Sequence, residues 1–257
     1  YFDNKYAKEQ GETPQAAMAI VDPYTGHVKA LYGGYGEKKG SRTLNRATQS
    51  KRQPGSSIKP IAVYAPAIDL KKITAATVID DVPVYLNHQQ PDKIYPTNYD
   101  TKTYDGLTTI RNALKASVNV VAARVWKDYL GYKDSLEYMK KSGIDRRKGV
   151  DENSVAIAMG GLETGVSPLE MAAAYAPFVN KGIYHTPITY TKVVDSNGKV
   201  ILENKPESHI VYSEQTAYIM VDMLKEVPKG RTSIYPHTGT AYGIISIQNG
   251  KMPVGGK

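Results

Sequence analysis

The strongest constraint on this chain is the pair Pro54-Gly55, which is followed by an apolar run with helical spacing. Pro fixes φ and Gly tolerates turn geometry, so the pair ends whatever element precedes it. Between Ser56 and Leu70 the apolar residues are Ile58, Ile61, Ala62, Ala65, Ile68 and Leu70. Their spacing predicts a helix with Ser56 at or just inside its N-terminus.

Ser56 and Lys59 lie three residues apart, on one face of the first helical turn. A serine becomes a nucleophile when a base lies within hydrogen-bond reach, and a lysine is that base when burial or another cation lowers its pKa. The unpaired N–H groups and the positive dipole end of a helix N-terminus could stabilise an oxyanion. Alone, however, Ser-x-x-Lys occurs by chance in many proteins, and serine at a helix start is usually only a cap.

The 257 residues, 41% of them hydrophobic, suit one large domain or two modest ones. The net charge of +8 is compatible with nucleic acid, an anionic membrane surface or an anionic polymer as a binding partner. Because the basic residues are scattered, we interpret them mainly as solvated faces and expect no nucleic-acid site. The chain has no cysteine, which excludes disulfides and thiolate zinc sites. It shows no signal peptide and no apolar run near the roughly 20 residues of a membrane span.

The chain begins at Tyr1 without Met, so we expect a piece of a longer protein, with residues 1–15 as a leader or linker. Residues 16–22 and 27–32 are predicted strands joined by the turn Pro23–Gly26. Because a two-stranded ribbon is marginal alone, we expect residues outside this sequence to complete the sheet, or the sheet to stay open. Residues 189–203 predict a second hairpin.

Helix signals follow the first hairpin. Thr108 or Thr109 is a predicted cap for a helix that Ser117-Val118-Asn119 interrupts, and Val120–Leu130 predicts the next helix. Ser167-Pro168-Leu169-Glu170 has the pattern of a capping box with Pro at the first helical position. Ser213 is the predicted cap of a further helix. The long polar segment over 80–104 is typical of a functional loop.

Three elements form a recognisable set: Ser56-x-x-Lys59, Ser117-Val118-Asn119, and a late lysine beside glycines. With the flanking sequence they resemble the transpeptidase domain of class A (bifunctional) penicillin-binding proteins. The segments that carry this resemblance are 17–26, 52–60, 98–100, 113–119 and 159–171. A β-lactamase fits less well, because its deacylating Glu motif has no place here.

The third motif departs from the family pattern, because Lys-Thr-Gly does not occur. His237-Thr238-Gly239-Thr240 has its shape with His in place of Lys. Pro253-Val254-Gly255-Gly256-Lys257 resembles the lead-in to Lys-Thr-Gly, ending at its lysine, and we favour this alternative. The first segment then resembles the turn that precedes the motif strand. The family's last strands and C-terminal helix are expected to be missing from this chain.

The resemblance implies an α/β fold over residues 16–257, an antiparallel sheet flanked by helices, with the active site between sheet and helical cluster. It assigns Ser56 as the nucleophile, whose backbone N–H is also an oxyanion donor, and Lys59 as its base. Ser117 would relay a proton to the leaving nitrogen, and Asn119 would orient the substrate and Lys59. Lys257 near Lys59 would favour a neutral base, since two amines lower each other's pKa.

The implied activity is D,D-transpeptidation of peptidoglycan stem peptides, with β-lactams as substrate mimics that acylate Ser56. The resemblance implies no metal or organic cofactor. It also implies a parent protein anchored at the extracytoplasmic face of the bacterial membrane, with a glycosyltransferase domain. The alternative is a penicillin- or wall-binding module of the same fold that acylates slowly or not at all.

Ordinary structural explanations stand beside these assignments. Ser117 and Asn119 could merely bond backbone at a helix break, and Lys257 could be an exposed terminal residue. His237 is interpreted as a loop residue, and the other histidines lack ligand spacing. Asp80, Asp81 and Glu152 have no partner at a telling spacing, so we interpret them as solvated.

Overall fold

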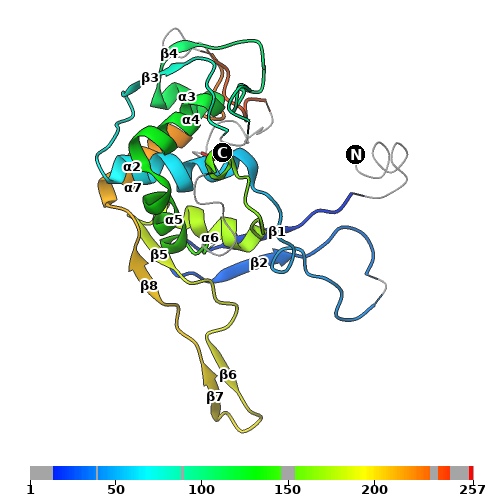
Figure 1. The fold of residues 1–257 in the computed structure, drawn as a ribbon. Helices are drawn as coiled ribbons and strands as arrows, with labels where there is room; N and C mark the ends of the chain where they lie inside the picture. Colours follow the sequence, from blue (N-terminus) through cyan, green and yellow to red (C-terminus); the bar gives the residue numbers. More distant parts are fainter. Residues whose placement is uncertain are drawn as a thin grey trace.

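The computed structural model describes residues 14–38, 40–87, 90–145, 154–231, 237–243 and 255–256. It confirms a mixed α/β fold with small antiparallel sheets beside a helical cluster (Figure 1). The sheets each have two strands among these residues. They pair β1 (Met18–Val21) with β2 (Val28–Tyr32), β3 (Val78–Asp81) with β4 (Gly106–Thr109), β5 (Ile183–His185) with β8 (Ser208–Ile210), and β6 (Lys192–Val194) with β7 (Val200–Glu203).

The helix predicted after Pro54-Gly55 is present but irregular. It consists of a 3₁₀ turn η2 (Gly55–Ile58), a wide π-helical segment η3 (Pro60–Tyr64) and α2 (Ala65–Asp69). Pro60 and Pro66 lack the N–H that a regular α-helix needs at each position, which accounts for the changes in hydrogen-bond pattern along this run. Every residue from Ile58 to Ala67 is buried, so the run forms the centre of the core.

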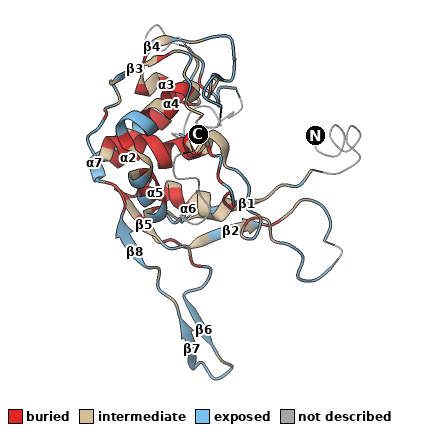
Figure 2. Ribbon diagram, viewed as in Figure 1, coloured by how far each residue is buried: buried red, intermediate tan, exposed pale blue. Residues whose placement is uncertain are grey.

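The remaining helices surround this central run. They are α3 (Ile110–Ala116), α4 (Asn119–Arg124), η4 (Val125–Leu130), α5 (Tyr132–Lys141), η5 (Val155–Met159), α6 (Pro168–Val179) and α7 (Glu214–Leu224). Figure 2 shows that buried residues concentrate in this cluster.

The predicted caps are confirmed. The Ser167 hydroxyl accepts from Glu170 N at 3.2 Å and the Glu170 carboxylate accepts from Ser167 N at 2.7 Å, which completes the capping box. Ser213 caps α7, and Thr109 rather than Thr108 caps α3. These local signals were readable from the sequence because each involves residues within one helical turn.

Both predicted hairpins are also confirmed. β1 and β2 pair antiparallel across the Pro23–Gly26 turn, and α6 packs against β1. The hairpin β6–β7 extends away from the body (Figure 1) and its residues are exposed on both strands. No helix within the described part of the chain is both long and apolar enough to cross a membrane.

Candidate active site

The Lys59 amine is the centre of the site. Its side chain is fully buried, on the short link between η2 and η3. The amine donates to Asn119 Oδ1 at 2.6 Å, Ser117 O at 2.8 Å, Ser117 Oγ at 3.3 Å and Val118 O at 3.4 Å. Lys59 therefore contacts two other predicted site residues, Ser117 and Asn119, which lie 58 and 60 positions further along the chain.

Ser117 has an uncommon backbone conformation. Helix α3 ends at this residue with φ +61° and ψ +36°, in the left-handed region, and its N–H bonds back to Ala113 O and Leu114 O. A non-glycine residue there costs on the order of 1 kcal/mol, and such residues concentrate at active sites. The conformation lets α4 restart at Asn119, so Ser117 O and Oγ both face the Lys59 amine.

Ser56 lies in η2, one turn before Lys59, and is half-buried. Its neighbour Ser57 uses its hydroxyl to donate to Pro54 O at 2.7 Å, and Ser57 O accepts from the Tyr175 hydroxyl at 2.6 Å. The base and nucleophile predicted from the sequence thus lie on the same turn, and the amine bonds toward Ser117 and Asn119.

A segment distant in the sequence packs against the turn that carries Ser56. Arg52 and Val166 exchange backbone hydrogen bonds of 3.0 and 2.8 Å. Gly160, with φ +83°, lies so close to Gly55 that a Cβ on it would meet the Gly55 backbone oxygen. The segment that contains Gly160 and Val166 therefore packs closely against the turn that carries Ser56.

Asp81 corrects an expectation. We interpreted it as solvated, but it is 1% exposed, and its two carboxylate oxygens each accept from Asn98 Nδ2 at 2.9 Å. Its Oδ2 also accepts from Asp105 N at 2.9 Å. The reason is its position at the end of β3, where alternation puts Ile79 and Asp81 on the buried face. That alternation was a signal in the sequence that could have identified it.

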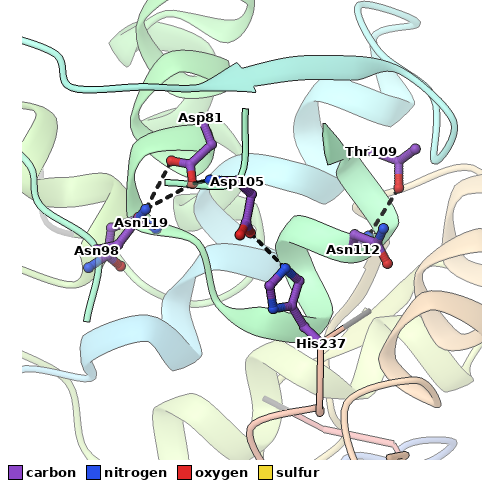
Figure 3. A network of polar contacts seen from close by, with 7 residues as sticks. All are labelled: Asp81, Asn98, Asp105, Thr109, Asn112, Asn119 and His237. Atoms are coloured by element: carbon purple, nitrogen blue, oxygen red, sulfur yellow. Dashed lines mark hydrogen bonds and ion pairs between the residues drawn. The ribbon is translucent and has the colours of Figure 1, made fainter. Parts of the chain in front are cut away.

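Asp80, the neighbour on the other face of β3, remains partly exposed, and its carbonyl accepts from Arg124 at 2.6 Å. His237 lies in a turn segment as expected, and its Nε2 is 2.9 Å from Asp105 Oδ2. Figure 3 shows this pair beside the Asp81, Asn98 and Asn119 cluster. Sequence reasoning assigned no role to Asn98 or Asp105.

Lys257 and Glu152 lie outside the described residues. Of the predicted lead-in segment, Gly255 is described and sits against the end of α7, where a Cβ would come within 3.0 Å of Leu224 C and 3.1 Å of Lys225 N. No group of three or more His, Cys, Asp or Glu within the described ranges is placed to hold a metal ion.

Two hollows border the site region without containing Ser56, Lys59, Ser117 or Asn119. An apolar groove of about 540 Å³ lies between β1, α6 and α7. A more polar cavity of about 460 Å³ lies beside the turn that carries Ser56, lined in part by Arg46, Arg52 and Ser57.

A family model described as the penicillin binding protein transpeptidase domain matches residues 16–257. Penicillin-binding protein 1A of Clostridium tetani is 45% identical over 223 residues, which cover 82% of this chain and 28% of that protein. Penicillin-binding protein 1F of Bacillus subtilis is 33% identical, covering 96% of this chain and 32% of that protein. The chain thus spans about a third or less of these relatives' length.

Solved structures agree in fold. Penicillin-binding protein 1A from Haemophilus influenzae superposes with a TM-score of 0.75 at 27% identity, covering 90% of this chain and 38% of that chain. The PonA1 protein from Mycobacterium tuberculosis, solved in complex with penicillin V, gives a TM-score of 0.67 at 26% identity, covering 88% of this chain and 59% of that chain.

Proposed function

We propose that this chain, which belongs to the penicillin-binding protein transpeptidase domain family, carries an acyl-serine D,D-transpeptidase site that cross-links peptidoglycan stem peptides. The observation that supports this most directly is that Ser117 and Asn119 both contact the buried amine of Lys59. Lys59 lies one helical turn after Ser56. The family match over residues 16–257 supports one transpeptidase domain over that range. That residues 1–15 are a leader or linker is a proposal from the sequence alone.

In the proposed reaction, Ser56 Oγ attacks the carbonyl of the penultimate D-Ala of a stem peptide, and its proton passes to the Lys59 amine. In free enzymes generally, the hydrogen bond between a catalytic base and its nucleophile is often long and tightens when substrate is bound. The backbone N–H of Ser56 stabilises the oxyanion at the attacked carbonyl. The carbon–nitrogen bond to the terminal D-Ala then breaks, leaving an acyl-Ser56 ester.

The leaving nitrogen needs a proton, and the Ser117 hydroxyl is placed to relay one, since its Oγ is 3.3 Å from the Lys59 amine. The amine of a second stem peptide attacks the ester, Ser56 recovers its proton, and a new peptide bond joins the two stems. Asn119 holds Lys59 through its side-chain oxygen and positions the substrate amide. For Lys257 the support remains the resemblance of Pro253–Lys257 to the family's third motif.

The same chemistry defines the partners that we propose. β-Lactams mimic the D-Ala-D-Ala end and leave a stable acyl-Ser56. The substrate is peptidoglycan, on which penicillin-binding proteins act outside the cytoplasmic membrane. We further propose that the parent protein is anchored in that membrane and carries a glycosyltransferase domain, as the resemblance to class A proteins implies.

The experiment is labelling of the full-length protein with a fluorescent penicillin, followed by mass spectrometry of the labelled peptide. We expect the adduct on Ser56, its loss in Ser56→Ala, and its retention in Ser57→Ala. Ser57 is the matched control because it is the adjacent hydroxyl and bonds Pro54 O instead. A folded protein that forms no adduct supports the binding-module alternative and refutes the enzyme.

A further inference from the structure

Helix α4 begins without a cap of its own. Its N-cap residue is Val118, whose side chain cannot accept a hydrogen bond, and Asn119 is its first residue. The missing acceptor comes from the distant Asn98, whose Oδ1 accepts from Asn119 N at 3.0 Å and from Val120 N at 3.3 Å. An amide oxygen in this place satisfies two of the N–H groups that every helix start leaves unpaired.

The Asn98 amide is itself held in one orientation by Asp81. An amide rotated by 180° exchanges its oxygen and nitrogen, and here both carboxylate oxygens of Asp81 accept from Nδ2 at 2.9 Å. Only the orientation with the oxygen toward α4 satisfies both neighbours. Asp81 is in turn buried and held by Asp105 N at 2.9 Å. Figure 3 shows these side chains side by side.

The residue before Asn98 completes the arrangement. Thr97 O accepts from Asn119 Nδ2 at 2.8 Å, which directs Asn119 Oδ1 to the Lys59 amine at 2.6 Å. One short segment, Thr97-Asn98, thus contacts both the backbone and the side chain of Asn119. If this segment moved, the amide that holds Lys59 would move with it.

We infer that Asp81 and Asn98 are positioning residues for acylation, which set the orientation of Asn119 toward Lys59 through the chain of contacts Asp81–Asn98–Asn119–Lys59. The inference rests on the proposed function of Ser56 and Lys59. The carboxylate of Asp81 fits this arrangement, because Asn98 links it to the N-terminus of α4, where a negative charge is favourable. Burial and, secondarily, the Asp81 carboxylate raise the pKa of Tyr64 in η3.

The test is an exchange of the two side chains. In Asp81→Asn, one of the two oxygens that accept from Asn98 Nδ2 becomes an NH₂ group, so a donor faces a donor and the orientation of the Asn98 amide is no longer fixed. In Asn98→Asp, two carboxylates face each other at a buried position. In the double variant, Asn at 81 donates to Asp at 98, whose other oxygen accepts from the start of α4, where a carboxylate is favourable.

The measurement is penicillin acylation of the full-length protein, separated into the non-covalent Kd and the maximal acylation rate. We expect each single variant to lower the maximal rate roughly 10- to 100-fold, as a misplaced catalytic group does, with little change in Kd. The double variant is expected to recover most of the rate. Asn98→Ala, which buries no new charge, serves as the second variant if a single exchange does not fold, and is expected to be slow as well.

Ser213→Ala is the matched control, since it removes a cap from α7 without touching this network. We expect it to lower the melting temperature and leave the acylation rate unchanged. The inference is overturned if folded single variants or Asn98→Ala acylate at the wild-type rate, if the double variant stays as slow as the singles, or if Ser213→Ala is equally slow. A wild-type protein without an adduct on Ser56 would refute the proposed function instead, and the inference with it.

Discussion

The side-chain oxygen of Asn119 lies 2.6 Å from the Lys59 amine, across 60 positions of sequence. The nitrogen of the same amide donates to Thr97 O at 2.8 Å, so the two ends of one side chain face opposite partners. This contact joins the turn that carries Ser56 to the start of α4, and it is shorter than the contacts of the Lys59 amine with Ser117 O, Ser117 Oγ and Val118 O.

Asn119→Ala is expected to slow penicillin acylation of Ser56 roughly 10- to 100-fold, because Lys59, the proposed base, loses the contact that positions it. It should also destabilise the fold by about 1–3 kcal/mol, since a buried amine loses an acceptor. Stopped-flow acylation and thermal unfolding measure the two effects. Asn112→Ala is the control, because its Oδ1 is buried without a partner among the described residues. A wild-type rate in Asn119→Ala would contradict the role.

Tyr175→Phe tests the support of the turn that carries Ser56, since the Tyr175 hydroxyl donates to Ser57 O at 2.6 Å. We expect a loss of about 1 kcal/mol and a melting temperature about 2–4 °C lower. Burial raises the Tyr175 pKa, so the hydroxyl stays protonated and remains a donor. Its contribution to the free energy of unfolding is complete below the unfolded-state pKa of about 10 and declines as the pH rises above that value. Tyr218→Phe, at a residue 75% exposed on α7, should change nothing. Equal melting temperatures for both variants would refute the prediction.

Gly160→Ala tests the close packing behind Ser56. The residue has φ +83°, and an added Cβ would meet the Gly55 backbone. We expect a loss of about 3 kcal/mol and slower acylation, because the turn must shift to make room. Gly198→Ala separates strain from contact, since Gly198 has φ +81° with nothing within 4 Å of the added carbon. It should cost only the smaller conformational penalty. Similar losses in denaturant unfolding would argue against the packing explanation.

Asp69→Asn tests a junction of three helices. Asp69 Oδ2 accepts from the Tyr138 hydroxyl at 2.7 Å, and Oδ1 accepts from Ser213 N and Oγ at 2.8 Å each. Burial raises its pKa, but these hydrogen bonds outweigh burial and leave the pKa below the usual value of 3.8. A carboxyl group whose pKa is lower in the folded state than in the unfolded state stabilises the fold at pH values above its unfolded-state pKa. That stabilisation is lost as the pH falls through its folded-state pKa.

We therefore expect wild type to be more stable than Asp69→Asn by about 1 kcal/mol at neutral pH, discounted for partial exposure, with the difference shrinking in acid. Denaturant unfolding across pH measures it. Glu137→Gln, on α5 with an exposed partner at Lys141, is the control and should show little difference. A difference that grew toward acid pH would have the wrong sign for this explanation.

Much of the helical framework could be predicted because its signals are local. The Ser167–Glu170 capping box and the Ser213 cap lie within single turns, and the run after Pro54-Gly55 shows its helical spacing directly. The irregular hydrogen bonding of that run was not predicted, although Pro60 and Pro66 are its cause. The motifs around Ser56 and Ser117 also indicated the family, since residue types and their order suffice for recognition.

The sequence by itself determined where several helices begin, which faces are apolar and which side chains are candidates for the chemistry, since these depend on residue types and on neighbours a few positions away. Only the tertiary structure decided that Asp81 accepts from Asn98 and that Asn98 caps α4. A hydrogen bond needs donor and acceptor within about 3 Å and correctly oriented. Residues that are remote in the chain reach that geometry only when the core packs the strands and helices that carry them.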